Sequence, residues 1–431
     1  MKKTGLDFRP FRAWRYDSGR VALSGVIAPP YDVISPAERE ALYARSPFNV
    51  VRLILGKETN FYEHARECWV EWTKQGVLTQ DPEPAFYLYE QAFAHPLDGR
   101  PLRRLALVGT LHLENTQGLV LPHEETFSGP KRDRFLLLEK TRTNLSPIFG
   151  LYPDSRRTLD RMVSSYRNSP PLFQAKEGQG ILHQGWAVRK KEDQEALGEL
   201  LFSKKILIAD GHHRFETALE YRRQMREKFP KASPDAPFNF VMMALVEFHD
   251  EGLLVLPTHR LIRSFGNFSS KNEFLERLRE PFDFQPLPEE RIFSELNRCS
   301  VTEKVFGGIF GKEGAFLLRL KNPEAARKVM PPGKPAIWYE IETALLNHFI
   351  FKKLWGIPEK EALSLLGYTH SPEEALRAVR ERKAEAAFLL RATGVDTIQE
   401  LADTGERMPQ KTTYFYPKLA SGLFFYHQEE A

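Results

Sequence analysis

The sequence predicts an α+β fold, in which helices separate most of the strands while some neighbouring strands pair as hairpins. Residues 206–209 form a short apolar run rich in β-branched side chains, and the residues after it repeat apolar side chains at helical spacing. Residues 85–91 and 104–113 have strand character and are separated by a turn sequence that contains Gly99. The first pattern favours a strand followed by a helix. The second favours an antiparallel pair of strands.

Length and composition indicate a folded protein of two or three domains. The chain has 431 residues, of which 42% are hydrophobic and 27% are charged, values typical of globular proteins. Its 61 basic and 57 acidic residues give a net charge of +4. This near balance counts against a nucleic-acid partner, because such proteins concentrate basic side chains on one face. A DNA-associated role is therefore the weakest of the functions considered.

Cysteine content and hydropathy indicate the compartment. The two cysteines, Cys68 and Cys299, have neither metal-binding nor redox spacing, which favours reduced thiols. No apolar run approaches the ~20 residues of a membrane span, and the N-terminal residues lack the apolar core of a signal peptide. We therefore expect a cytoplasmic protein without a membrane partner. The sequence does not indicate an oligomeric state.

The N-terminal region contains a rigid loop. Residues 28–34 read Ala-Pro-Pro-Tyr-Asp-Val-Ile, and the paired prolines exclude a central strand or a helix interior. Ser35 and Pro36 then form a typical helix start. Tyr31 and Asp32 either line a ligand pocket or only belong to the rigid turn.

Further elements follow along the chain. Residues 49–55 have the composition of a strand, and residues 61–75 have the apolar spacing of an amphipathic helix. Residues 240–248 and 253–262 read as two strands of a hairpin. Residues 269–322 alternate between helix and strand patterns, which predicts a small separate lobe.

A histidine and two carboxylates follow a predicted strand at residues 120–126. His123, Glu124 and Glu125 precede a basic segment at residues 128–134. A carboxylate at this point can take a proton from a hydroxyl nucleophile, and the basic side chains can hold the charge of a transferring phosphate. The alternative is that both glutamates are exposed caps of the helix that starts near Lys131.

The change from strand to helix occurs at Asp210 and Gly211, before His212, His213 and Arg214. Glycine allows a tight turn and close approach to a ligand, and the amide groups at a helix start attract an anion. An arginine side chain can bind a phosphate through two parallel hydrogen bonds. We therefore expect phosphate or nucleotide binding by these five residues. A metal site and a structural helix cap are the alternatives.

Two other polar segments, residues 411–413 and residues 259–260, each have two alternative roles. Lys411, Thr412 and Thr413 provide a cation and two hydroxyls in succession, which suits either anion binding or a tail packed on the core. His259 and Arg260 face either a functional site or the solvent, and the sequence does not decide between these.

Almost the full length resembles the bacterial and archaeal family known as domain of unknown function one thousand and fifteen. Five motifs carry this resemblance: residues 28–34, 121–126, 144–150, 209–214 and 408–413. Three of these regions are also similar to motifs of free serine kinases of the ParB/sulfiredoxin superfamily, in the same order. They are Pro122-His123-Glu124, Asp210-Gly211-His212-His213-Arg214 and Gln410-Lys411-Thr412-Thr413, the last with its proline one place early.

The kinase resemblance implies a role for each motif. Glu124 would act as the base on the substrate hydroxyl, and His213 would join it as a catalytic residue by stabilising phosphate charge. The turn from Asp210 to Arg214 would hold nucleotide phosphates, with Asp210 as a ligand of Mg²⁺. The substrate would be bound by a further set of residues: His123, Lys411, Thr412 and Thr413.

The same resemblance implies a domain arrangement. It predicts a ParB/sulfiredoxin-like catalytic core at residues 116–265, an N-terminal extension at 1–115 and a smaller C-terminal α+β lobe at 266–431. The sequence departs from the kinases in two ways. Glu124 and Asp210 are 210 − 124 = 86 positions apart, a longer interval than in the compact kinases. A second acidic residue of those kinases corresponds to Gly129 and Pro130, so either Glu125 replaces it or its role is absent here.

The leading hypothesis is therefore a phosphotransferase. It would move a phosphate from ADP or ATP, with Mg²⁺, to a small hydroxyl substrate, for which free L-serine is the best candidate. The alternative is a nucleotide-binding switch of the same superfamily without transfer chemistry.

Overall fold

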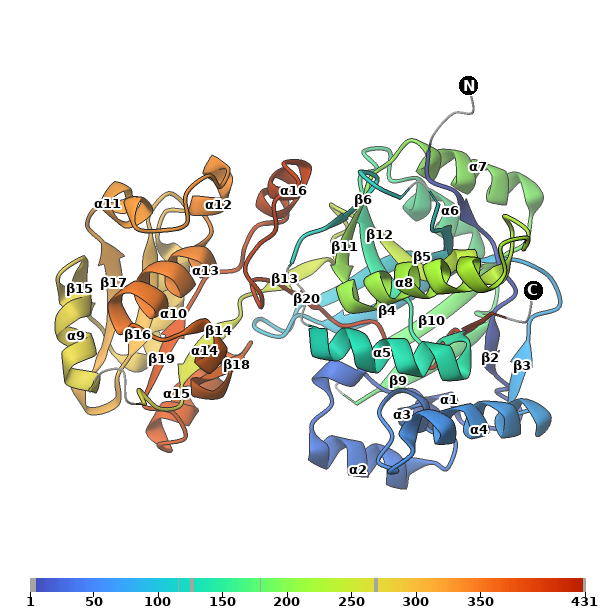
Figure 1. Ribbon diagram of the computed structural model, residues 1–431, viewed down its shortest axis with the longest axis horizontal. Helices are drawn as coiled ribbons and strands as arrows, with labels where there is room; N and C mark the ends of the chain where they lie inside the picture. The colour runs from blue at the N-terminus through green and yellow to red at the C-terminus, as the bar shows by residue number, and fades with distance from the viewer. Residues whose placement is uncertain (1–4, 115, 125–127, 179, 267–269, 429–431) are drawn as a thin grey trace. The chain divides into compact units, whose positions relative to one another are not determined.

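The computed structural model describes residues 5–114, 116–124, 128–178, 180–266 and 270–428. The chain divides into two compact units (Figure 1). The first unit comprises residues 1–122, 126–254 and 417–431, and the second comprises residues 123–125 and 255–416. The domain boundaries expected after residues 115 and 265 stay a prediction.

The first unit is built on a nine-stranded mixed sheet, which confirms the expected mixed α/β fold class. Its path is β6-β11-β8-β12-β5-β4-β10-β9, and β1 pairs with β5 at the side. Pairing is parallel for β6 with β11 and for β8 with β12, and antiparallel elsewhere in this sheet. The strands are β1 (Phe8–Arg9), β4 (Phe86–Ala94), β5 (Pro101–His112), β6 (Val120–Pro122), β8 (Ile148–Tyr152), β9 (Phe173–Glu177), β10 (Ile181–Val188), β11 (Ile206–Asp210) and β12 (Phe240–Glu247).

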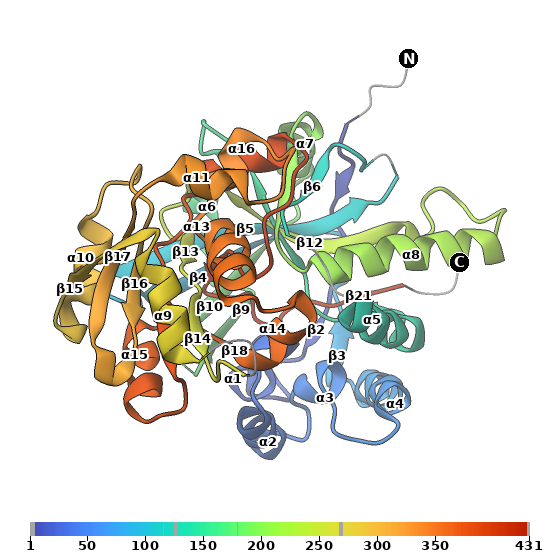
Figure 2. The same cartoon turned by 60° about the vertical axis from the view of Figure 1, so that its left-hand side comes forward.

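Helices pack on this sheet through their apolar faces. Leu159, Val163, Leu197 and Leu201 of α6 and α7 join the sheet's buried aliphatic side chains in one core cluster. Helices α5 and α8 lie side by side in Figures 1 and 2. The helices of this unit are α1 (Leu23–Val26), α2 (Pro36–Arg45), α3 (Val51–Ile54), α4 (Phe61–Lys74), α5 (Ser128–Thr141), α6 (Thr158–Tyr166), α7 (Lys191–Phe202) and α8 (His212–Lys228).

Strand pairing sets the positions of two predicted motifs. The expected hairpin is confirmed, since β4 and β5 pair antiparallel with Tyr87 opposite Val108. Strands β6 and β11 are parallel, with Pro122 opposite Ile208, so both strands end at the same edge of the sheet. Asp210 is the last residue of β11.

The strand expected at residues 49–55 is wrong, because Val51–Ile54 form the short helix α3. The Asn49 Oδ1 atom accepts the Val51 amide at 3.0 Å, and the Leu55 amide donates to the Val51 carbonyl at 2.8 Å. The apolar side chains of α3 are buried in a cluster with Trp69 and Trp72 of α4. A short, mostly apolar run does not show enough periodicity to distinguish a helix from a strand.

The hairpin expected from residues 240–262 is also wrong. Strand β12 lies inside the large sheet between β5 and β8, whereas β13 (Leu254–Leu256) pairs with β20 (Tyr414–Tyr416). Strand β14 (His259–Ile262) belongs to the sheet of the second unit. The two apolar runs predicted strands correctly, but strand partners are chosen by non-local packing.

The second unit contains a six-stranded antiparallel sheet in the order β15-β17-β16-β19-β14-β18. Its other strands are β15 (Phe282–Pro286), β16 (Val305–Ile309), β17 (Ala315–Leu320), β18 (Leu366–Thr369) and β19 (Ala386–Leu389). Its helices include α9 (Lys271–Arg279), α10 (Ile292–Arg298), α15 (Pro372–Arg380) and α16 (Val395–Asp403). Buried side chains of α10 and α15 pack on β16, β17 and β19 in one core cluster.

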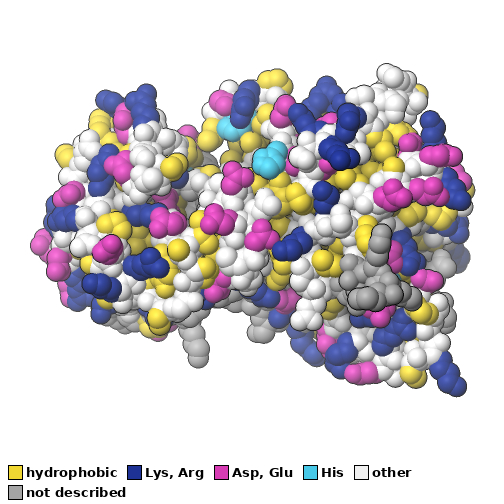
Figure 3. Space-filling model, turned by 90° about the horizontal axis from the view of Figure 1, so that it is seen from above, with side chains coloured by type: hydrophobic (Ala, Val, Ile, Leu, Met, Phe, Trp, Pro, Cys, Tyr) yellow, Lys and Arg dark blue, Asp and Glu magenta, His cyan; other side chains and the backbone are white. Residues whose placement is uncertain are grey.

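Two surface properties bear on the class of protein. Acidic and basic side chains are interspersed over the face shown in Figure 3. Among the described residues, none of the helices has the length and apolar character needed to cross a bilayer.

Candidate functional site

The turn between β11 and α8 is built around Gly211. This residue is the N-cap of α8 with φ 91° and ψ 26°, a conformation that costs glycine little and other residues more. A Cβ atom at this position would lie 3.0 to 3.1 Å from the guanidinium of Arg214. Glycine is therefore needed both for the backbone turn and to let Arg214 fold back over it.

Asp210 is held between two cations. Its Oδ2 atom accepts a hydrogen bond from Arg214 Nη2 at 2.7 Å, and its Oδ1 atom pairs with Lys418 Nζ. The three side chains are 12 to 18% exposed. Burial by itself raises a carboxyl pKa, but Lys418 and Arg214 hold the pKa of Asp210 well below its ordinary range. Asp210 is therefore ionised throughout the physiological pH range.

The position of Lys418 depends on buried groups of the sheet. Arg104, which is 1% exposed, donates from Nη2 to the Pro417 carbonyl and to Gln91 Oε1. Gln91 Nε2 in turn donates to the Lys418 carbonyl at 3.0 Å. These bonds hold the segment that presents Lys418 to Asp210. We infer that Arg104 is a positioning residue.

Sequence reasoning missed both Lys418 and Arg104. Lys418 lies in an otherwise aromatic and apolar stretch, residues 414–426. A single lysine in such a stretch is a signal, because a buried ammonium group needs a partner. Arg104 opens an apolar strand and gives the same signal.

The electrostatics of the turn favour an anion. Two cations face one carboxylate, and the first turn of α8 contains no acidic residue. The helix dipole adds positive potential at this end. His212 and His213 are half-buried in the same turn. The structure therefore brings together Asp210, Gly211, His212, His213 and Arg214, the five residues predicted to bind phosphate.

The expected Mg²⁺ ligand has competing partners. Both carboxylate oxygens of Asp210 are engaged, one by Lys418 and one by Arg214. Magnesium would therefore have to displace at least one of these cations to coordinate Asp210 directly. A water-mediated contact to the metal would leave both ion pairs intact.

Tyr31 and Arg134 form a second cationic group in the first unit. The guanidinium of Arg134 stacks on the Tyr31 ring, 3.9 Å from its centroid, and donates from Nη1 to the Ile54 carbonyl at 2.9 Å. Burial raises the pKa of the Tyr31 hydroxyl. Tyr31 lines a cavity together with Arg134 and Arg214, whereas Asp32 is exposed. The alternative left open for Tyr31 is thus decided in favour of a cavity wall.

A separate cluster in the second unit joins His123, Glu124 and Thr413. The Thr413 hydroxyl donates to Glu124 Oε1 at 3.0 Å, and the Thr413 amide donates to the same oxygen at 3.3 Å. His123 Nε2 is 2.9 Å from the Thr413 hydroxyl oxygen. Because the hydroxyl proton is directed to Glu124, His123 must donate from Nε2. The Glu124 side chain is 19% exposed and His123 is buried.

This cluster can accept a hydroxyl proton but differs from a hydrolase triad. In a triad the carboxylate contacts the far nitrogen of the histidine. Here the Glu124 carboxylate contacts the hydroxyl itself. The arrangement suits a carboxylate that binds a hydroxyl group and can take its proton.

The other late-loop residues have different surroundings. Thr412 is buried, donates to the Pro409 carbonyl at 2.5 Å and lies 2.8 Å from the Thr343 hydroxyl oxygen. Lys411 is exposed and has φ 58°. Thr413 therefore contacts the glutamate cluster, Thr412 is engaged in the protein interior, and Lys411 points to solvent. Their binding roles stay a prediction.

His259 and Arg260 are buried in the second unit, which rules out the solvent-facing alternative. Burial lowers the pKa of His259 to about 3, so this histidine is neutral at pH 7. Burial lowers the pKa of Arg260 to about 10, and the nearby Tyr368 and Glu124 oppose this shift in part. Arg260 therefore adds positive potential near Glu124. Glu125, the expected replacement for a second acidic residue, lies outside the described residues.

The chain belongs to the family described as Protein of unknown function (DUF1015), whose model matches residues 8–343. This confirms the family that the sequence motifs indicated. A comparison with curated proteins gave no significant match.

Solved structures to which the chain is similar include proteins of low sequence identity. A conserved hypothetical protein from Pyrococcus furiosus is 14% identical, covering 71% of this chain and 91% of that chain, with a TM-score of 0.36. A free serine kinase in complex with AMP is 14% identical, covering 71% and 88%, with a TM-score of 0.35. SbnI from Staphylococcus aureus, with a C-terminal truncation, is 8% identical, covering 75% and 90%, with a TM-score of 0.37.

Proposed function

We propose that the protein is a phosphotransferase that moves a terminal phosphate from ADP or ATP to a small hydroxyl substrate, with free L-serine as the best candidate. The observation that carries this proposal is the Glu124 carboxylate, which accepts a hydrogen bond from a hydroxyl group at 3.0 Å. In the proposed reaction the substrate hydroxyl takes the place that Thr413 occupies. A base in this position needs hydrogen-bond contact with the proton that it removes.

The chemistry is an in-line transfer. Glu124 takes the proton of the substrate hydroxyl as its oxygen forms a bond to the terminal phosphorus. The bond from that phosphorus to the bridging oxygen of the nucleotide breaks, which leaves AMP from ADP or ADP from ATP. Positioning and stabilisation of phosphate charge provide most of the rate in such reactions.

The Asp210 turn is the proposed phosphate site. Lys418, Arg214 and the first amides of α8 would contact the phosphates, and His213 would stabilise charge on the transferring group. Mg²⁺ would neutralise further charge, through water to Asp210 or by displacing one of its cations. We also propose that residues 116–265 form a ParB/sulfiredoxin-like core. Both motifs begin where neighbouring parallel strands end, at Pro122 in β6 and at Asp210 in β11.

The direct test is product formation. Pure protein is incubated with L-serine, Mg²⁺ and ADP or ATP, and O-phosphoserine is measured by phosphorus NMR and mass spectrometry. Glu124→Gln should lower the rate about 10²–10⁴-fold, the contribution of a general base. Glu199→Gln, at an exposed position on α7, is the matched control and should leave the rate unchanged. No turnover of wild type across a panel of hydroxyl metabolites would reject the proposal.

A nucleotide-binding switch is the second candidate. The division of the chain into two compact units favours this candidate, because the Asp210 turn and Glu124 belong to different units. Anion binding at the turn does not require Glu124. A switch predicts that ADP or ATP raises the melting temperature equally in wild type and in Glu124→Gln, without turnover. Product formation by the wild type would exclude it.

A further inference from the structure

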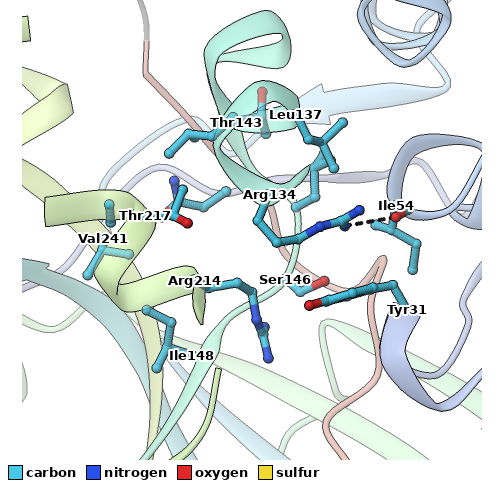
Figure 4. Close-up of a pocket in the computed structure, with 14 residues that line it drawn as sticks. Tyr31, Ile54, Arg134, Leu137, Thr143, Ser146, Ile148, Arg214, Thr217 and Val241 are labelled. Carbon is cyan, nitrogen blue, oxygen red and sulfur yellow. Dashed lines mark hydrogen bonds between the residues drawn. The ribbon is translucent and has the colours of Figure 1, made fainter. Parts of the chain in front are cut away.

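A small cavity lies in the first unit next to the Asp210 turn. It has a volume of about 60 Å³. It is bounded by the turn that contains Tyr31, by α5 and α8, and by the segment that precedes β8 (Figure 4). A buried water needs about 10–15 Å³ measured in this way, so the cavity has room for about four to six groups of that size. This space matches a small organic molecule but not a nucleotide.

Polar groups converge on one part of the cavity wall. Figure 4 shows the hydroxyl groups of Tyr31 and Ser146 close to the guanidinium of Arg214, with Arg134 beside the Tyr31 ring. The Ser146 hydroxyl lies 2.6 Å from the Ser421 hydroxyl. The Tyr31 hydroxyl makes no hydrogen bond within the described part of the chain. Tyr31 is half-buried, so its hydroxyl is available to a ligand in the cavity.

Most of the remaining wall is hydrocarbon, apart from Thr143, Asn144 and Thr217, whose side chains bond to other parts of the protein. Leu137 and Leu138 come from α5, Ala218 from α8, and Ile148 and Val241 from the sheet. The wall thus combines aliphatic side chains with a few polar groups, as is typical of small-molecule sites.

The charged side chains of the cavity wall indicate the sign of the charge that a ligand should carry. Two arginines line the cavity, and the lining residues that the structure describes include no carboxylate. Arg134 is paired with Asp133, and Arg214 bonds to Asp210 and, from Nη1, to the Pro147 carbonyl at 2.6 Å. A guanidinium has five N–H groups, so each arginine retains donors beyond these bonds. A ligand with one negative charge fits better than a dianion, because Asp133 and Asp210 already balance much of the positive charge.

We propose that this cavity is a binding site for a small aliphatic carboxylate of two to four carbons. Its carboxylate would lie against Arg214, Tyr31 and Ser146, and its hydrocarbon part against the leucines of α5. A free phosphate fits less well, because it would leave the aliphatic wall without a partner. The site gives the N-terminal Pro-Pro-Tyr-Asp turn a function, since that turn supplies Tyr31. It does not depend on phosphotransferase activity.

The experiment measures binding of acids against their amides, without nucleotide. Propionate, L-lactate and L-serine are each titrated into the full-length protein by calorimetry, in parallel with propionamide, lactamide and serinamide. At least one acid should bind saturably and at least 10-fold more tightly than its amide. Tyr31→Phe should weaken that acid about 3- to 10-fold, the effect of one hydrogen bond, while keeping the ring that Arg134 covers. Ala218→Leu, which fills the cavity, should abolish binding.

Tyr339→Phe is the matched control, because it removes a tyrosine hydroxyl that donates to the Pro331 carbonyl at 2.7 Å in the second unit. It should leave the acid's affinity unchanged, and melting temperatures confirm that each variant is folded. Equal binding of acids and amides, no saturable binding, or equal effects of Tyr31→Phe and Tyr339→Phe would overturn the proposal. An acid that binds and is also phosphorylated in the transfer assay is a substrate, and one that binds unmodified is an effector. Either outcome supports the site, whichever way the phosphotransferase test falls.

Discussion

Replacing Lys418 with methionine removes one of the two cations that hold Asp210, while keeping most of the side chain's hydrocarbon. Asp210 and Lys418 are only 15% and 12% exposed, so solvent screens their attraction weakly. A hydrogen bond to a charged group contributes about 1.5–3 kcal/mol to stability. Leaving a buried charge wholly unpaired costs about 3–5 kcal/mol, but Arg214 still contacts the carboxylate. We therefore expect a loss of about 2 kcal/mol, which lowers the melting temperature of the first unit by about 4–8 °C.

The pH dependence separates this electrostatic effect from simple loss of packing. Because the folded-state pKa of Asp210 is lowered, its ion pairs stabilise the fold fully above the unfolded pKa of about 3.9. This stabilisation is lost as the pH falls through the lower folded-state pKa. The difference between wild type and Lys418→Met should therefore be largest near pH 7 and shrink below about pH 4.

Scanning calorimetry at pH 7 and at pH 3 provides the measurement, and Lys418→Arg should restore part of the stability. The control is Lys231→Met, an exposed lysine in the loop after α8, which should change the melting temperature by less than about 1 °C. A stability difference that is the same at both pH values would refute the role of the ion pair. So would a wild-type melting temperature in Lys418→Met at pH 7.

Three other variants test the remaining features. Gly211→Ala should destabilise the protein by about 1–2 kcal/mol, because φ is 91°, and should weaken nucleotide binding, because the new Cβ displaces Arg214. Denaturation measures the first effect and calorimetry the second. Thr413→Val should cost about 1 kcal/mol in unfolding free energy by removing the hydroxyl between His123 and Glu124, whereas Thr413→Ser should not. Burial raises the pKa of Asp250 to about 6 in the folded state, above its unfolded value of about 3.9. Protonation of Asp250 should therefore make the wild type more stable as the pH falls from 7 to 4.5, by at most about 3 kcal/mol. Urea denaturation at both pH values should show this gain, and Asp250→Asn should lose it.

Sequence patterns predicted correctly those elements that depend only on residues close together in the chain. The change of period at Asp210 and Gly211 predicted the end of β11 and the start of α8, because a glycine turn and helical spacing are properties of neighbouring residues. The β4–β5 hairpin was predictable for the same reason. The prediction for residues 49–55 failed because most of their side chains are buried, which leaves too little periodicity to distinguish a helix from a strand.

The sequence by itself determined the mixed fold class, the family and the residue types of the turn that we propose binds phosphate, since each is contained in contiguous motifs. Only the tertiary structure decided which distant groups complete those motifs. Lys418 reaches Asp210 across 208 positions, and Thr413 reaches Glu124 across 289. Such contacts depend on how strands pair and where the C-terminal segment returns to the sheet. Those choices depend on the free energy of the whole chain, so a short stretch can show that Lys418 needs a partner but not that the partner is Asp210.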